Sequence, residues 1–177
     1  AQYFMDKDEN AIYQGISSIK YCNDQIADEL YELSKNHYDN FVDLLSDIIS
    51  KTSVDDRQLH ILTTLNFFSE FGKNKYLLSI IDMYNLLGKC KTLKKDKIAS
   101  LNIREEDVRK CAEKETPKQY SNVDKVKLVK LIISDLENKP LSIKEQIVYE
   151  QEYLGNIMYK NPKAPKDMYY VLECKFY

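Results

Sequence analysis

Residues 54–81, VDDRQLHILTTLNFFSEFGKNKYLLSII, decide the fold class, because their apolar side chains recur at the spacing of amphipathic helices. Ser53 or Asp55 can cap a first helix, which we expect to run until Gly72 stops it. A second helix is predicted over about residues 74–87, where a glycine follows as a natural stop. Because the connection between them is short, we expect both helices to pack in one unit.

Helical spacing continues on both sides of this stretch. Residues 15–30 predict two short helices around a tight turn at residues 21–23. The last predicted helix begins with a capping box formed by Ser142 and Glu145. Apart from the helices already named, we expect helices over residues 41–49, 103–111, 123–136 and 143–154.

Strand-like alternation is confined to the two ends of the chain. A short hairpin is predicted from residues 2–5 and 11–14, and one strand over residues 168–174. Four glycines and four prolines in 177 residues argue against an all-β fold with many turns. Length and a hydrophobic content of 44% predict one domain, or one domain and a fragment, in a mainly α fold.

Composition also limits the cellular setting that we expect for the chain. Without an apolar run long enough to span a bilayer, we expect no membrane partner. The four cysteines stand apart, which disfavours a zinc site or disulfide framework and favours a reduced, cytoplasmic setting. Because the chain begins with Ala1 instead of Met, we expect a piece excised from something longer.

The charge is distributed unevenly. Residues 1–86 hold 7 basic and 14 acidic side chains, while residues 87–177 hold 19 and 14, for a net charge of -2. Residues 89–101 are predicted to be a basic linker or loop, which is either simply solvated or in contact with phosphate. Its five candidate lysines are Lys89, Lys91, Lys94, Lys95 and Lys97.

Catalytic patterns are missing from the sequence. There is no glycine-rich phosphate loop, no zinc-protease motif and no nucleophile elbow. His37 and His60 stand alone, and the paired acids at 55–56 and 105–107 lie at helix starts, where they compensate the helix dipole. We therefore expect no catalytic residue, no metal and no cofactor in these 177 residues.

Several segments, in order along the chain, resemble one family. GISSIKYCNDQIADEL (15–30) resembles the helix-hairpin-helix in the fingers region of bacterial C-family replicative DNA polymerases, the DNA polymerase III alpha subunits. Residues 54–81 resemble the helices that follow it, and CAEKETPKQYSNVD (111–124) resembles a Glu-Lys-Glu-Thr segment of Gram-positive members. SIKEQIVYEQEYLGNIMYKNP (142–162) resembles the helix leading toward the OB-fold domain.

The resemblance implies a compact multi-helix domain with a degenerate helix-hairpin-helix, and four parts in the chain. These are a helical domain with the helix-hairpin-helix (1–88), the basic linker (89–101), a helical extension (102–160), and a connector with the first strand of a truncated domain (161–177). The parent would be a phage or bacterial polymerase whose Mg²⁺ and catalytic aspartates lie in a palm domain outside this chain. This piece would position duplex DNA without catalysis, beside the other domains of the parent.

The hairpin itself departs from the family pattern. Glycines let hairpin amides approach a phosphate closely, yet the two glycine positions are Tyr21 and Asn23 here. One hypothesis is a weak, sequence-independent contact with the duplex backbone through Lys20, Tyr21, Cys22 and Asn23, or through the basic linker. The alternative for the hairpin is a packing element in which Tyr21 is partly buried. The alternative for the whole chain is a helical protein-protein interaction module that no longer binds DNA.

Overall fold

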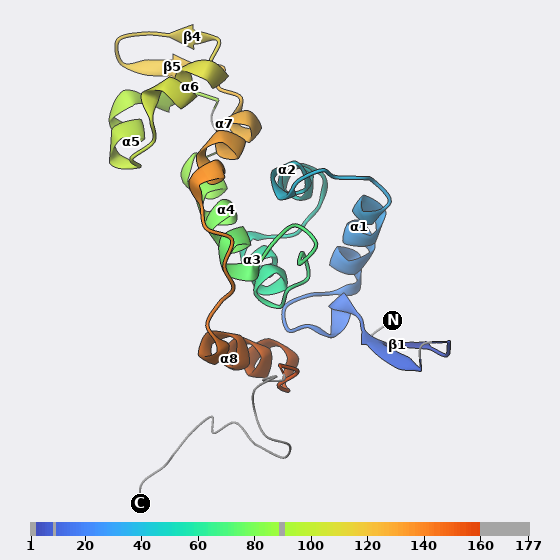
Figure 1. The fold of residues 1–177 in the computed structure, drawn as a ribbon. Helices are drawn as coiled ribbons and strands as arrows, with labels where there is room; N and C mark the ends of the chain where they lie inside the picture. Colours follow the sequence, from blue (N-terminus) through green and yellow to red (C-terminus); the bar gives the residue numbers. More distant parts are fainter. Residues whose placement is uncertain (1–2, 9, 89–90, 160–177) are drawn as a thin grey trace, which may run out of the picture.

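The apolar stripes predicted from the sequence lie on helices that pack around a shared centre (Figure 1). The computed structural model describes residues 3–8, 10–88 and 91–159. Within them, the first four α-helices are α1 (Asp24–Ser34), α2 (Phe41–Lys51), α3 (Asp56–Thr64) and α4 (Asn74–Leu86). The later ones are α5 (Lys95–Ser100), α6 (Glu105–Cys111), α7 (Lys125–Ile132) and α8 (Ile143–Leu154).

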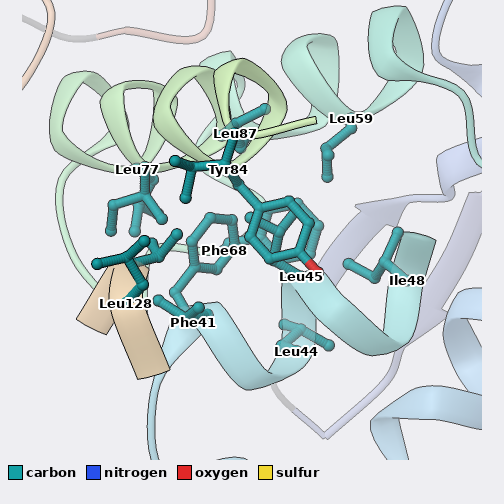
Figure 2. Packing of buried hydrophobic residues seen from close by; sticks show 14 of the residues in the cluster. Phe41, Leu44, Leu45, Ile48, Leu59, Phe68, Leu77, Tyr84, Leu87 and Leu128 are labelled. Atoms are coloured by element: carbon teal, nitrogen blue, oxygen red, sulfur yellow. The ribbon is translucent and has the colours of Figure 1, made fainter. Parts of the chain in front are cut away.

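One continuous hydrophobic core joins these helices from α1 to α7. Phe41 at the start of α2 packs against Phe68, with ring centroids 5.4 Å apart, and α7 contributes Leu128 to the same cluster (Figure 2). Leu45 and Ile48 on α2 are fully enclosed. The predicted mainly α, compact domain is thus confirmed, and its core does not stop at residue 88.

The predicted N-terminal hairpin is present as β1 (Tyr3–Asp6) and β2 (Ala11–Gln14), paired antiparallel. Of the two helices predicted within residues 15–30, the prediction of the first is wrong. A single 3-10 turn, η1 (Ile16–Ser18), lies there instead. The Ser18 hydroxyl donates to the carbonyl of Gly15 at 2.7 Å. Serine hydroxyls that bond to nearby backbone compete with helix formation, which accounts for the short element.

Helix α3 ends earlier than predicted, at Thr64 and not near Gly72. Asn66 takes a left-handed conformation, with φ of 64°, just after the C-cap. The Phe67 amide then donates to the carbonyl of Leu62, and the Asn66 amide donates to that of Thr63. These two bonds form a Schellman motif, which satisfies the last carbonyls and stops the helix.

The predicted basic linker has regular structure in its described part. Residues 93–94 form strand β3 (Leu93–Lys94), and α5 follows directly, so the expectation of an irregular loop is wrong there. Leu93 pairs with Tyr120 of β5 (Gln119–Ser121), the central strand of a sheet with the order β3-β5-β4, in which β4 is Lys114–Glu115. Leu93 and Ile98 anchor the segment because both are buried in the main core.

The C-terminal half otherwise follows the predicted pattern. The predicted helix over 123–136 divides into α7 and a 3-10 turn, η2 (Ile133–Asp135). The Ser142 capping box is confirmed at the start of α8, and Gly155 ends that helix with φ of 75°. The predicted strand over 168–174 lies outside the described residues.

Asn74 joins α8 to the rest of the fold. Its side chain is buried, with 2% of its surface exposed, and its amide donates to the Thr64 carbonyl at 3.2 Å and to Gln146 Oε1 at 2.7 Å. Its Oδ1 accepts from the amides of Lys75 and Leu141. One side chain therefore links the end of α3, the start of α4, the connector before α8 and α8 itself.

We predict that Asn74→Ala lowers the free energy of unfolding by about 3 kcal/mol, because several buried polar groups lose their partner at once. Urea denaturation followed by circular dichroism measures this. Asn85→Ala, on the exposed side of the same helix, is the matched control: it removes one solvent-exposed hydrogen bond to Asp56 and should cost no more than about 1 kcal/mol. Similar losses for both variants would contradict a central role for Asn74.

An ion-pair network supports the small sheet. Glu115 bonds to Arg109 Nε at 2.9 Å and to Lys95 Nζ at 2.7 Å, and the Tyr120 hydroxyl lies 3.0 Å from the same carboxylate. Arg109 and then Lys95 lower the pKa of Glu115 from 4.5 to about 2. Since folding lowers the pKa of Glu115, these ion pairs stabilise the folded state above pH 4.5. That stabilisation is lost as the pH falls toward 2.

We predict that Glu115→Gln lowers the melting temperature at neutral pH, and that the difference from wild type shrinks between about pH 5 and pH 2. Melting curves across this range test the prediction. Glu113→Gln is the matched control, because Glu113 accepts a hydrogen bond from the Asn122 amide instead of a cation. If the difference in melting temperature between Glu115→Gln and wild type stays constant with pH, the lowered pKa of Glu115 does not stabilise the fold.

Candidate functional site

Residues 19–22 form a β-turn with an unusual backbone. The Cys22 amide donates to the Ile19 carbonyl at 3.0 Å, and Tyr21 has φ of 71°. A positive φ at the third position is typical of a type II turn, where glycine is normally preferred. Tyr21 therefore occupies a glycine-like backbone conformation, at a cost of about 1–2 kcal/mol for a residue with a Cβ.

Two distant helices hold this turn. The Lys20 amide donates to the Tyr153 carbonyl on α8 at 3.0 Å, and the Gln58 side chain on α3 donates to the Tyr21 carbonyl at 3.0 Å. Cys22 is half-buried beneath the turn, and burial raises the pKa of its thiol. The thiol therefore packs inward and stays protonated, while the Tyr21 side chain lies at the surface.

Asn23 does not take the left-handed conformation that its place in the family pattern suggests. It is extended, with φ of -133°, and its side chain accepts from the Ile26 amide as the N-cap of α1. In the described part of the chain, the amides of Asn23, Asp24 and Gln25 donate to no protein acceptor. The turn thus leads into a helix start with free donors, although Asp24 places a carboxylate beside them.

Two cations converge on the exposed Tyr21 ring, which retains 43% of its accessible surface. The Arg57 guanidinium carbon lies 3.4 Å from the ring centroid, and Lys20 Nζ lies 5.1 Å from it. Lys20 beside the phenol oxygen, with a smaller contribution from Arg57, lowers the pKa of Tyr21. Because Arg57 covers one face of the ring, Tyr21 is only partly covered, and its exposure fits both the contact with the DNA backbone and the alternative of a packing element.

Sequence reasoning missed Arg57. Arg57 lies in the first turn of α3, where the helix dipole disfavours a cation. That unfavourable position was the one feature of the sequence that could have marked Arg57 as a functional residue. Its proximity to Tyr21 depends on the tertiary contact of α3 with the turn. The other two arginines, Arg104 and Arg109, pair with carboxylates, whereas Arg57 has no carboxylate partner among the described residues.

Acidic groups near the turn are mostly engaged elsewhere. Asp55 caps α3 by accepting from the Gln58 amide, and Asp56 accepts from the Asn85 side chain. Asp24 is the nearby carboxylate with no such partner among the described side chains. These hydrogen bonds come from neutral amides and leave the carboxylates charged, as the contribution of Asp55 to the raised pKa of Cys22 shows, so the local field is mixed.

The lysines of the basic segment do not join this site. Helix α5 lies at the end of the fold away from α8 and the N-terminal hairpin (Figure 1). Lys95 is paired with Glu115 and with Glu105, which removes it from the candidate phosphate ligands. Lys91, Lys94 and Lys97 are exposed, while Lys89 lies outside the described residues.

Lys125 is a further cation beside the basic segment. Its ammonium donates to the Gly88 carbonyl at 2.8 Å and lies 3.6 Å from the centroid of the Tyr84 ring. Burial, followed by repulsion from Lys97, lowers the pKa of Lys125 to about 8. It also lines an open hollow of about 550 Å³ together with Lys91 and Glu113.

No catalytic constellation assembles in the part of the chain described here. His37 faces Asp39 on the surface, and His60 lies between Asp56 and Asp82. No three histidine, cysteine, aspartate or glutamate side chains group as metal ligands would within residues 3–8, 10–88 and 91–159. Among those residues, no helix has the length and apolar character needed to cross a membrane.

Comparisons of the chain with protein-family models, with curated proteins and with solved structures find no match.

We predict that Lys125 titrates with a midpoint of about 8, and that Lys97→Gln raises the midpoint by removing a repelling charge. Carbon-detected NMR of the lysine side chains, recorded between pH 6 and pH 11, measures it. Lys97→Arg keeps the charge and should leave the midpoint unchanged. An equal shift in both Lys97 variants would show that charge repulsion is not the cause.

Proposed function

We propose that this chain is a non-catalytic, duplex-positioning helical region of a DNA polymerase III alpha-type replicative polymerase. Its turn at residues 19–23 contacts the DNA backbone. The observation that carries the proposal is a turn with Tyr21 in the left-handed conformation that leads into unbonded helix amides, beside Lys20 and Arg57, which form no ion pair among the described residues. Amides and ammonium groups that face solvent at a turn are suited to phosphate oxygens.

The contact is weak and independent of base sequence. Backbone amides and Lys20 recognise phosphate, which carries no sequence information. Asp24 lies beside the same amides and repels a polyanion, so the isolated chain binds no more tightly than the roughly 10⁻⁴ to 10⁻⁶ M of non-specific complexes. The other domains of the parent polymerase supply the remaining contacts and the catalytic residues.

A second candidate function is a helical protein-protein interaction module. One observation favours it: an open groove of about 440 Å³ lies between the end of α1, α2 and the turn after α3. Phe67 borders this groove and is 46% exposed, packed edge-on against Phe68. Exposed aromatic side chains around a groove are typical of sites that bind another protein.

We predict that Lys20→Ala weakens binding to a labelled duplex about five-fold and reduces the slope of log affinity against log salt by about 1, because one phosphate contact is lost. Fluorescence anisotropy at low and moderate salt measures both. The comparison variant is Lys91→Ala/Lys94→Ala/Lys97→Ala, which leaves the paired Lys95 in place. Asp24→Asn should strengthen binding, because it removes a negative charge beside the turn.

The outcomes separate the sites. If the triple variant loses binding and Lys20→Ala does not, the contact belongs to the basic segment and not to the turn. If the wild-type chain does not bind duplex at low salt, the DNA proposal is wrong and the protein-interaction module is the better account. Circular dichroism of each variant confirms that the fold is retained.

A further inference from the structure

We infer that Arg57 is a second phosphate ligand of this turn and that the Tyr21 ring holds it in place. The inference rests on the proposed function, since it adds a ligand and a positioning residue to the same site. Tyr21, which has the left-handed conformation, lies against Arg57 from the first turn of α3. The ligand class is a phosphodiester backbone.

The geometry of the pair favours an oriented guanidinium. At 3.4 Å from the ring centroid, Arg57 is stacked on one face of Tyr21, as a planar cation prefers over an aromatic ring. Stacking uses the face of the guanidinium and leaves its N–H groups at the edges available for oxygen acceptors. Arginine binds phosphate through two such parallel N–H groups, so this orientation suits a bidentate contact.

The pair is fixed to the turn from both sides. Gln58, the residue after Arg57, donates to the Tyr21 carbonyl, so the same turn of α3 holds the Tyr21 backbone and carries the cation on its ring. The Lys20 amide is bonded to α8 through Tyr153. Lys20 and Arg57 are therefore presented by one structural unit, which lowers the entropy lost when both contact a phosphate.

The Tyr21 side chain consequently has a use at a position where glycine would fit the backbone better. A glycine would relieve the left-handed conformation and open the turn, but it would leave Arg57 with no ring to stack on. Because Arg57 covers one face of the ring, that face is closed to stacking by a base. The site therefore favours the backbone of DNA over its bases.

The test is a set of anisotropy titrations of the 177-residue chain with one labelled duplex across a salt series. Arg57→Ala is expected to weaken binding about five-fold and to reduce the salt slope by about 1. Arg57→Lys keeps the charge but not the planar stack, and should recover part of the affinity. Tyr21→Phe keeps the ring over which Arg57 lies, and should lose less affinity than removal of the ring.

Tyr21→Gly separates positioning from folding, because glycine suits φ of 71° and this variant is expected to fold at least as well as wild type. It should lose as much affinity as Arg57→Ala, and the double variant Tyr21→Gly/Arg57→Ala should lose no more than either single variant. This non-additivity is the signature of one residue acting through the other.

Each contrary result has a distinct meaning. If Lys20→Ala weakens binding while Arg57→Ala does not, the inference is wrong and the proposed function stands. If Arg57→Ala weakens binding equally in wild type and in Tyr21→Gly, Arg57 is a ligand but Tyr21 does not position it, which overturns the second half of the inference. If the wild-type chain binds no duplex, the inference fails together with the proposed function.

Discussion

The buried side chain of Asn74 is the interaction on which the rest of the structure depends. It bonds to the end of α3, to the connector before α8 and to Gln146 on α8. Because α8 is held there, the Tyr153 carbonyl reaches the Lys20 amide and fixes the turn. A single amide in the core thus contributes to the position of a surface turn to which it is not bonded.

Sequence periodicity predicted most helices, since each buries a stripe of apolar side chains and several carry recognisable caps. The C-terminal end of α3 and the short η1 were missed, because a left-handed Asn66 and a serine hydroxyl stop these elements locally. The sheet around Tyr120 was also missed. Its strands are two or three residues long, which is too short for an alternating pattern to show.

The candidate site was predicted only in part. A tight turn at residues 21–23 was predicted from the break in helical spacing, whereas the β-turn spans residues 19–22, and Lys20 was named as a cation of this region. Arg57 was not, because its place on the Tyr21 ring results from the packing of α3 against the turn. Ion pairing likewise removed Lys95 from the lysines that the sequence grouped together, since Glu115 lies beyond the segment and is brought near by the sheet.

The bond between the Lys20 amide and the Tyr153 carbonyl joins the two ends of the described chain. A ribosome synthesises Lys20 well before Tyr153, so the turn lacks its α8 anchor until the residues between them have been made. Contacts so distant in sequence also form late in folding, since the intervening chain must first be ordered. The turn at residues 19–22 is therefore completed after the helices that support it.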